Sequence, residues 1–288
     1  LDSAILLRCA EIFHDGRFIV QAGGGLVRDS DPMNEAREST AKANGLIDVL
    51  SNEGLGARTY LTDALKNTVE QKLQSRNETL STFWMTRQDA APEQLLALKD
   101  LSVTIINNED DFAFMIGHII KSFGADLQVI DTFDYDFKRY ARDITIIGPG
   151  PGDPNDTAHP RMALLHDIVK TLRHNNHPVL GICLGHQVLA AHEGLTVERQ
   201  TKSTQGMQKR VRTFNTDCRL GFYNSFSPIF TEDARRKTDI RMDIDDESRI
   251  IAMQGNGFIG FQFHPESIMS ENGTDLLYKA LVTLRYAL

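Results

Sequence analysis

Short apolar, strand-like segments alternate with helix-like segments from residue 103 onward, and this alternation constrains the fold more than any other feature of the chain. The strand-like runs are SVTIINN, DLQVID, DITIIGPG and HPVLGIC, and the helix-like runs include DFAFMIGHIIKSFG and LGHQVLAAHEG. Alternation of this kind is typical of an α/β fold, a mostly parallel sheet with helices on both faces. Such sheets bind ligands at the carboxyl ends of their strands. We therefore expect a site near Gly148–Gly152 and Cys183, which both fall at strand ends.

Residues 1–50 predict a small α+β fragment. Two apolar, β-rich runs flank Asp15-Gly16, a strong signal for a hairpin turn, and the helix that follows has Asp31 as a cap and Pro32 in its first turn. Because a hairpin and one helix cannot bury a core of their own, this zone implies a partner domain. The absence of a methionine at residue 1 also favours a fragment of a longer chain.

Residues 51–102 predict a linker with helical segments, and residues 103–288 predict the main domain. The apolar residues of the linker follow helical spacing at Leu65, Val69, Leu73 and Leu80. Phe83 and Trp84 follow this helix. We interpret the aromatic pair as a contact that docks the linker onto a domain, and we assign no chemistry to it.

The composition excludes several classes of protein. Apolar residues make up 41% of the chain, which is enough for a sizeable core. The net charge of −8 and the lack of a basic stripe argue against a nucleic-acid partner, since phosphate binding needs clustered Lys and Arg. The three cysteines have no CxxC spacing, so neither a disulfide framework nor a zinc site is expected, and a cytoplasmic location is the simplest. We recognise neither a membrane span nor a signal peptide.

Cys183 lies in GICLGHQ, between the strand-like PVLGIC and the helix-like LGHQVLAA. One interpretation is a small core residue, because free cysteine is among the most buried residue types. The alternative is a nucleophile in a sharp strand-to-helix turn, which needs small residues such as Gly181 and Gly185 on either side. The helix that follows would direct free N–H groups at the sulfur, where they can stabilise a thiolate and a developing oxyanion. The symmetric glycines favour the nucleophile.

The segment FIGFQFHPES supplies a candidate base and its partner. His264 and Glu266 are two residues apart, so on a strand both side chains would point to the same face. A carboxylate beside an imidazole can fix its tautomer and orient it towards a thiol. Alone, the pair would be interpreted as a surface ion pair. Its combination with G-x-C-x-G on an alternating α/β chain favours catalysis.

The glycine- and proline-rich segment GPGPGDP occupies residues 148–154. Repeated glycine and proline at a strand end usually form only a tight turn. Pro151 has no N–H, so any oxyanion donors from this segment would come from its glycines.

Together these motifs resemble the class I (triad) glutamine amidotransferases across residues 103–288. The resemblance implies a flavodoxin-like fold and no cofactor for this domain. It implies that Cys183 attacks the side-chain amide of glutamine, that His264 acts as base and acid, and that Glu266 orients His264. Gly150 and Leu184 would supply the oxyanion-hole N–H groups. The residues implied to bind glutamine are Gly150, Pro151, Gly152, Gln187, Ser225 and Phe226. Asn224 departs from the family, since anthranilate-type members usually carry a histidine there.

The N-terminal segment VQAGGGLVRDSDPMNEARESTAKA resembles the C-terminal end of the chorismate-utilising synthases. The resemblance implies that Gly23, Gly25 and Lys42 contact chorismate and that Glu35 and Glu38 bind Mg²⁺. The two glutamates lie three residues apart on one helical face, which suits a shared hard cation. The alternative is an exposed helix with a Glu38–Lys42 ion pair. The implied partners are glutamine, chorismate, the remainder of the synthase domain and a second copy of the chain in a homodimer.

A synthase end, a linker and an amidotransferase on one chain narrow the function further. The segments SRNETLSTFW, STQGMQ and GFYNSF resemble the phenazine-pathway 2-amino-2-desoxyisochorismate synthases, with fused anthranilate synthases as the alternative. Both deliver ammonia from glutamine to chorismate, and the anthranilate enzymes then eliminate pyruvate. Two other classes stay open. One is a non-catalytic amidotransferase-like binding module, and the other is a γ-glutamyl peptide hydrolase, which leaves the N-terminal motif unexplained.

Overall fold

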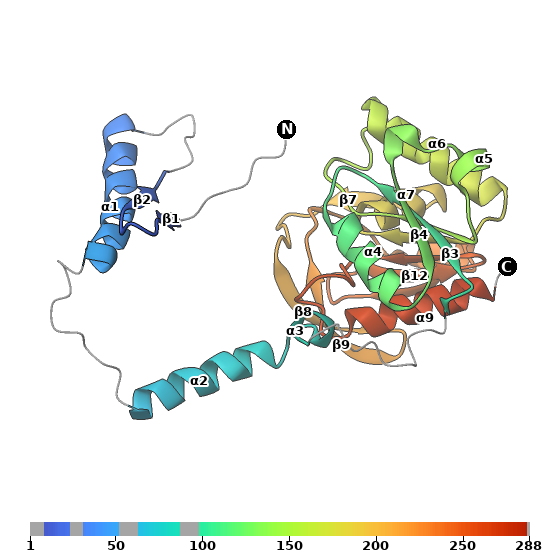
Figure 1. Ribbon diagram of the computed structural model, residues 1–288. Helices are drawn as coiled ribbons and strands as arrows, with labels where there is room; N and C mark the ends of the chain where they lie inside the picture. Colours follow the sequence, from blue (N-terminus) through green and yellow to red (C-terminus); the bar gives the residue numbers. More distant parts are fainter. Residues whose placement is uncertain (1–8, 24–30, 52–62, 87–97, 287–288) are drawn as a thin grey trace. The chain divides into compact units, whose positions relative to one another are not determined.

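A computed structural model of the chain describes residues 9–23, 31–51, 63–86 and 98–286 (Figure 1). The chain divides into two compact units, Leu1–Gln71 and Lys72–Leu288. The expected domain boundaries near residues 50 and 102 stay predictions, because residues 52–62 and 87–97 lie outside the described part of the chain.

The first unit contains the expected hairpin and helix. Strands β1 (Cys9–Ile12) and β2 (Phe18–Gln21) pair antiparallel, and Gly16 adopts the positive φ of 87° that their turn requires. Helix α1 (Pro32–Ser51) begins after Asp31, whose Oδ1 accepts a hydrogen bond from Asn34 N at 2.8 Å. No residue of α1 is buried, which agrees with the expectation that a hairpin and one helix do not make a core.

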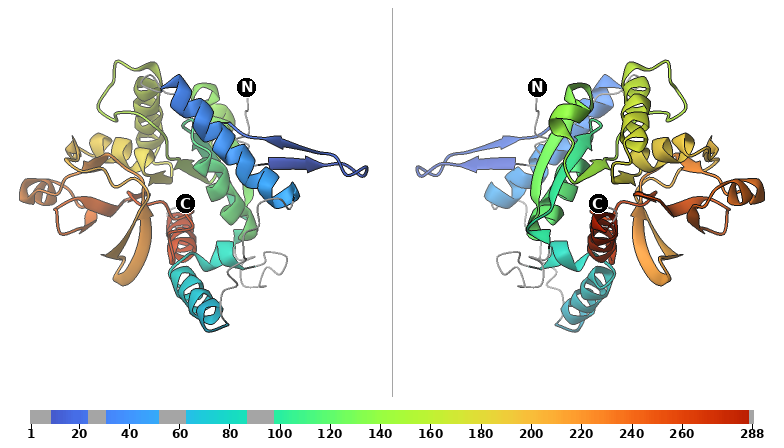
Figure 2. Two further views of the ribbon diagram at one scale, coloured as in Figure 1. Left: turned by 90° about the vertical axis from the view of Figure 1, so that its left-hand side faces the viewer. Right: turned by 90° about the vertical axis from the view of Figure 1, so that its right-hand side faces the viewer.

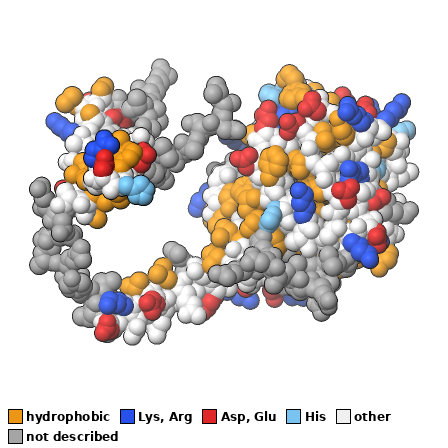
Figure 3. Space-filling model, in the orientation of Figure 1, with side chains coloured by type: hydrophobic (Ala, Val, Ile, Leu, Met, Phe, Trp, Pro, Cys, Tyr) orange, Lys and Arg blue, Asp and Glu red, His pale blue; other side chains and the backbone are white. Residues whose placement is uncertain are grey.

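Two helices lie between the hairpin unit and the main sheet in the sequence. Helix α2 (Asp63–Asn77) and the short α3 (Thr82–Met85) confirm the helical character expected of this segment. The apolar residues of α2 lie one turn apart and are 40–47% exposed: Leu65, Val69 and Leu73. Figure 3 shows hydrophobic side chains along one side of this helix.

A seven-stranded sheet forms the centre of the second unit, in the order β11-β12-β13-β6-β5-β3-β4. Its strands are β3 (Ser102–Asn107), β4 (Asp126–Asp131), β5 (Ile144–Ile147), β6 (Val179–Ile182), β11 (Arg241–Ile244), β12 (Ile250–Gly255) and β13 (Phe258–Phe261). The pairs from β13 through β4 are parallel, and only β11–β12 and β12–β13 are antiparallel. Every residue of β5, β6 and β13 is buried, as expected for strands covered on both faces. The predicted mostly parallel sheet is confirmed.

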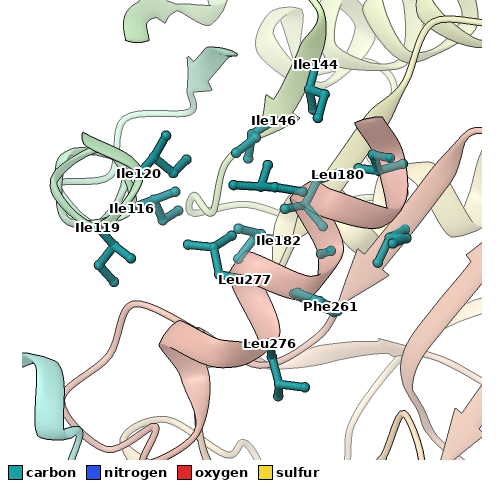
Figure 4. Close-up of a cluster of buried hydrophobic side chains, with 14 of the residues drawn as sticks. Ile116, Ile119, Ile120, Ile144, Ile146, Leu180, Ile182, Phe261, Leu276 and Leu277 are labelled. Atoms are coloured by element: carbon teal, nitrogen blue, oxygen red, sulfur yellow. The ribbon is translucent and has the colours of Figure 1, made fainter. Parts of the chain in front are cut away.

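Helices cover both faces of this sheet (Figure 2). Helices α4 (Phe112–Ser122) and α9 (Gly273–Arg285) pack on one face, where their aliphatic side chains meet those of β5, β6 and β13 (Figure 4). Helices α6 (Pro160–His174) and α7 (Leu184–His192) pack on the other. This sandwich fixes the carboxyl ends of β5 and β6, from which the candidate site is built.

The remaining elements surround the sheet. They are η2 (Thr132–Asp134), α5 (Phe137–Tyr140), β7 (Val197–Arg199), β8 (Met207–Thr213), β9 (Thr216–Phe222), β10 (Phe226–Pro228) and α8 (Glu232–Lys237). The β8–β9 hairpin leads into Tyr223–Phe226, which matters for the site. Among the helices that the structure describes, we find none that combines the length and apolar character needed to cross a membrane.

Candidate active site

Cys183 is the residue at which strand β6 turns into helix α7. Its backbone adopts φ 52° and ψ −102°, a conformation that residues with a side chain adopt rarely and at a cost of about 1–3 kcal/mol. Cys183 N donates to Phe261 O at 2.8 Å, and Cys183 O accepts from Gln187 N at 3.0 Å. Neighbouring strand and helix thus hold the strained residue from both sides. The predicted sharp turn at Cys183 is present.

Gly181 and Gly185 are the residues that make this turn possible. A Cβ on Gly185 would lie 2.1 Å from Ile147 O, and a Cβ on Gly181 would lie 2.6 Å from Gly185 O. Both obstacles are backbone atoms, which cannot rotate away as a side chain can. The close packing of α7 on β5 and β6 therefore requires glycine at both positions, as the G-x-C-x-G spacing predicts.

His264 and Glu266 lie beyond the end of strand β13, which corrects the expectation that they share a strand. β13 ends at Phe261, His264 forms an isolated bridge with Gly221, and Glu266 lies in the following turn. Pro265 between them has no N–H to donate to a ladder, so a regular strand is not maintained here. The turn still brings the side chains together, with 2.6 Å between His264 Nδ1 and Glu266 Oε1.

The imidazole and the carboxylate are both removed from solvent. His264 is 1% exposed and Glu266 is 0% exposed. Burial by itself lowers the pKa of His264, but the Glu266 carboxylate and Cys183 act against it, and the pKa of His264 is raised well above its usual value. His264 Nε2 has no conventional hydrogen-bond partner among the described residues. The ring is therefore fixed through Nδ1 and leaves Nε2 for chemistry.

A cavity of ≈ 500 Å³ contains both Cys183 and His264 in its wall. Its lining residues are Glu109, Asp110, Asp111, Phe112, Gly150, Pro151, Cys183, Gln205, Tyr223 and His264. The rings of Phe112 and Tyr223 each lie 4.9 Å from the imidazole of His264. These apolar walls exclude water from the imidazole, and the three acidic residues give the cavity a negative rim.

The glycine-rich loop after β5 packs tightly against Asn108, a buried residue that the sequence did not single out. A Cβ on Gly150 would lie 2.5 Å from both Asn108 Cβ and Asn108 O, so only glycine fits. Asn108 Nδ2 donates to Gly148 O at 2.7 Å, and Asn108 Oδ1 accepts from Thr132 Oγ1 at 2.6 Å. The amide thereby fixes the loop to the end of β3.

Arg161 of α6 also holds this loop. The residue is 4% exposed. Its Nη2 donates to Pro151 O at 2.6 Å and its Nη1 to Asn108 O at 3.1 Å. Arg161 Nε lies 3.4 Å from Glu109 Oε2, a carboxylate at the cavity rim. No local motif marks Asn108 or Arg161, because their role depends on contacts between distant segments.

The remaining predicted glutamine-binding residues are not among the described residues that line the cavity. These are Gly152, Gln187, Ser225 and Phe226, and Leu184 does not line it either. The amide Nε2 of Gln187 donates to Phe226 O at 2.8 Å and contacts Gln262 Oε1 at 3.3 Å. Gln187 thus joins α7 to the start of β10, and its role in binding stays a prediction.

Asn224, the position at which the chain departs from the resembled family, forms a buried connection. Asn224 Nδ2 donates to Phe226 O at 2.8 Å, and its Oδ1 accepts from Thr204 Oγ1 at 2.8 Å. Its backbone oxygen accepts from Thr204 N at 3.0 Å. The asparagine side chain therefore positions the loop that carries Gln205 to the cavity.

The synthase-like residues lie in the first unit. Glu38 Oε1 lies 2.6 Å from Lys42 Nζ, and this hydrogen bond lowers the pKa of Glu38. Lys42 Nζ also donates to Gly23 O at 3.5 Å, while Gly25 falls outside the described residues. In the ranges that the structure describes, no three His, Cys, Asp or Glu residues gather as a metal site. Glu35 and Glu38 both lie on α1. Mg²⁺ needs only one or two carboxylates and completes its shell with water and substrate, so the role of this pair in metal binding stays a prediction.

Two protein families match the chain. Residues 104–284 match the class-I glutamine amidotransferases, and residues 1–48 match the chorismate binding enzymes. The match confirms the resemblances of both parts of the sequence.

Individual relatives extend this finding. The chain is 35% identical to "Anthranilate synthase, phenazine specific" of Pseudomonas chlororaphis over 98% of its own length, and 36% identical to the protein of that name in Pseudomonas fluorescens. It spans 45% of the length of each. It is 28% identical to "Anthranilate synthase component 2, pyocyanine specific" of Pseudomonas aeruginosa, over 63% of this chain and 94% of that one.

The fold also occurs among solved structures. One of them belongs to a putative GMP synthase protein from Thermoplasma acidophilum, with a TM-score of 0.54, 16% identity, and coverage of 65% of this chain and 94% of that one. At this identity the likeness concerns the fold alone, and it agrees with the α/β architecture.

Proposed function

The chain belongs to the class-I glutamine amidotransferases, an enzyme family, and we propose that it hydrolyses glutamine to glutamate and ammonia through Cys183, His264 and Glu266. One observation carries the proposal: Cys183 and His264 line the same cavity, and Nδ1 of His264 lies 2.6 Å from Oε1 of the buried Glu266 carboxylate. A nucleophile beside a base that a third group orients is the arrangement covalent catalysis needs.

In the proposed first half-reaction, the thiolate of Cys183 attacks the side-chain amide carbon of glutamine, and the amide oxygen takes up the negative charge. The N–H groups of Leu184 and Gly150 stabilise this oxyanion. Leu184 is the first residue of α7, so its N–H has no acceptor inside the helix. His264 gives its proton to the amide nitrogen, the carbon–nitrogen bond breaks, and ammonia leaves behind a glutamyl thioester.

In the second half-reaction, water attacks the thioester. His264 takes a proton from the water, the carbon–sulfur bond breaks, and glutamate leaves with the thiolate restored. Glu266 keeps Nδ1 of His264 protonated, so Nε2 is the atom that exchanges protons in both steps. The raised pKa of His264 supports its role as the acid that protonates the leaving nitrogen.

We extend the proposal to the use of the ammonia. The match of residues 1–48 to the chorismate binding enzymes supports delivery of ammonia to a chorismate-aminating synthase that makes 2-amino-2-desoxyisochorismate in phenazine biosynthesis. The relatives named as phenazine-specific support the same assignment. The name of these relatives, anthranilate synthase, keeps a fused anthranilate synthase as the alternative.

The proposal assigns roles to the first unit as well. Gly23, Gly25 and Lys42 contact chorismate, and Glu35 and Glu38 hold Mg²⁺, which neutralises negative charge on a bound substrate. A homodimer and a cytoplasmic location complete the proposal. The free, buried thiols of Cys183 and Cys218 are consistent with a reducing compartment.

Incubation of the chain with L-glutamine, with glutamate and ammonia measured over time, tests the amidotransferase proposal. A glutamine-analogue alkylator should label Cys183 and stop the reaction. A chain that neither releases ammonia nor reacts with the analogue would be a binding module instead. The product formed from chorismate, glutamine and Mg²⁺ when a complete synthase domain is present, identified by mass, separates the aminated intermediate from anthranilate.

Glu266→Gln tests the electrostatic part of the triad. Glutamine keeps the size of the side chain but removes the charge that contributes most to raising the pKa of His264, so this pKa falls even though Cys183 still acts to raise it. Because His264 must be protonated when ammonia leaves, the basic limb of the pH profile of kcat/KM should move to lower pH. We expect kcat to fall by roughly 10²–10⁴-fold, by analogy with triads that lose their orienting carboxylate.

Glu271→Gln is the matched control. Glu271 lies five residues after Glu266, and its Oε2 is 4.0 Å from Nε of Arg219. Its carboxylate therefore pairs with Arg219 and not with the imidazole of His264. This variant should keep the wild-type pH profile. An unchanged basic limb in Glu266→Gln would show that the carboxylate does not set the protonation of His264.

A further inference from the structure

A segment of the linker contacts the loop that carries His264 and Glu266. We call Thr79–Met85 the docking segment and His264–Glu271 the triad loop. Ser81 N donates to Ile268 O at 2.8 Å. Gln208 Nε2, from strand β8, bridges the two by donating to Thr79 O at 2.7 Å and Met269 O at 2.8 Å. Ser81 is 1% exposed, so the contact is a packed interface within the second unit.

Trp84 makes the contact nearest to the triad. Its indole Nε1 donates to the backbone oxygen of Glu266 at 2.6 Å. The indole stacks on His118 of α4, with ring centroids 5.6 Å apart and an interplanar angle of 19°, and meets the edge of Phe83 at 4.9 Å. These rings fix the direction of the indole N–H. Trp84 therefore holds one particular carbonyl, that of Glu266.

The carboxylate of Glu266 depends on how its backbone is held. Oε1 reaches His264 Nδ1, while Oε2 has no hydrogen-bond partner among the described residues. No regular strand supports the residue, since β13 ends at Phe261 and Glu266 lies in a turn. The hydrogen bond from Trp84 to the Glu266 carbonyl thus replaces part of the backbone hydrogen bonding that a β-strand would provide. It also fixes the backbone position from which the Glu266 carboxylate contacts the imidazole.

Trp84 lies outside the part of the chain that matches the amidotransferase family, which begins at residue 104. The docking segment instead follows directly after α2. Two backbone hydrogen bonds connect them: Glu78 N donates to Gln74 O at 3.1 Å, and Leu80 N donates to Asn77 O at 3.0 Å. α2 crosses the boundary between the two units at Gln71 and Lys72. Part of the support for the triad loop therefore comes from the connection between the synthase-like and amidotransferase parts, alongside the hydrogen bonds that tie the loop to β9.

We propose that Trp84 is a positioning residue for glutamine hydrolysis: through its bond to the Glu266 carbonyl, the linker holds the Glu266–His264 pair in its working geometry. This inference rests on the proposed function, because it assigns Glu266 to the triad. The indole does not touch the reacting atoms. It acts on kcat through the orientation of the carboxylate, and it leaves the cavity walls that bind the substrate in place.

Trp84→Phe tests the inference in the full 288-residue chain, because phenylalanine keeps an aromatic ring but removes the N–H donor. We expect kcat for glutamine hydrolysis to fall about 10-fold, in line with the sensitivity of catalysis to small displacements, with KM within about twofold of wild type. Rates are expressed per Cys183 titrated by the glutamine-analogue alkylator, so that unfolded chain does not count. Met85→Leu is the matched control: Met85 lies next to Trp84 in α3, is 47% exposed, and should leave kcat unchanged.

Ser81→Pro provides an independent variant if Trp84→Phe folds poorly. Ser81 has φ −57°, which proline adopts without strain, and proline removes the N–H that binds Ile268 O. We expect the same fall in kcat with little change in KM. Wild-type kcat in both variants would overturn the inference. So would an effect seen only as a higher KM or as a smaller amount of Cys183 that the alkylator titrates. In these cases the proposed function still stands, as long as the wild type hydrolyses glutamine. A wild-type chain without glutaminase activity would overturn the proposed function, and this inference with it.

Discussion

Replacement of Cys183 by alanine is expected to abolish glutamine hydrolysis, with a fall in kcat on the order of 10⁴-fold or more. In the proposed mechanism the sulfur forms and breaks the bond to the glutamyl carbon, and alanine has no atom that could take its place. Alanine keeps the Cβ at φ 52° and is smaller than cysteine, so the turn between β6 and α7 should persist. The loss should therefore appear in turnover and not in folding.

Glutamate release from L-glutamine measures this loss, and Cys218→Ala is the matched control. Cys218 is also a buried free thiol, but it lies on β9 and is not among the described residues that line the site cavity. Cys218→Ala should retain activity. With a complete synthase domain, added ammonium salts should restore chorismate amination to Cys183→Ala. Substantial glutamine hydrolysis by Cys183→Ala would show that the nucleophile lies elsewhere.

Gly185→Ala is expected to be among the most damaging single-methyl changes near the site. The added Cβ would lie 2.1 Å from Ile147 O and 2.9 Å from Ile147 Cβ. Because the obstacle is the backbone of β5, helix α7 must move away from the sheet, and Cys183 at its start must move with it. Overpacking of this kind costs about 3 kcal/mol or more of the free energy of unfolding, and activity should be lost as well.

Gly117→Ala is the control for this change. Gly117 is also a buried helical glycine packed against the sheet, but its added Cβ would meet Leu127 Cδ2 at 2.8 Å, the far end of a flexible side chain. The higher helix propensity of alanine offsets part of that contact, so urea unfolding should show a change within about 1 kcal/mol. Similar unfolding free energies for both variants would contradict the view that backbone contact decides the cost.

The sequence identified the parts of the site that depend on neighbours along the chain. The turn at Cys183 needs glycine two residues to either side, and the spacing of Gly181 and Gly185 can be read directly. The sheet could also be predicted, because β-branched runs separated by helices leave few arrangements. Likewise, Asp31 as a cap and Gly16 in a hairpin turn are local requirements, and both are present.

The spacing of His264 and Glu266 correctly predicted that their side chains meet, but it wrongly placed both residues on a β-strand. Side chains two residues apart share a face only on a regular strand, yet the strand ends at Phe261 and a turn joins the two side chains. Pro265, which lies between them, removes the N–H that a ladder would need. The contact itself therefore depends on the turn, whose shape a two-residue spacing does not specify.

Only the tertiary structure revealed the residues that hold the site in place. Asn108 and Arg161 fix the glycine-rich loop from the end of β3 and from α6. The sequence predicted that Trp84 docks the linker onto a domain, but not that its partner is Glu266, 182 residues away in the sequence. Periodicity and turn chemistry act over a few residues, so a sequence displays them. Hydrogen bonds between distant segments depend on how helices and strands stack, and any Asn, Arg or Trp could make them once the fold places it there. The sequence therefore determined which residues can react, and packing decided which residues hold them in position.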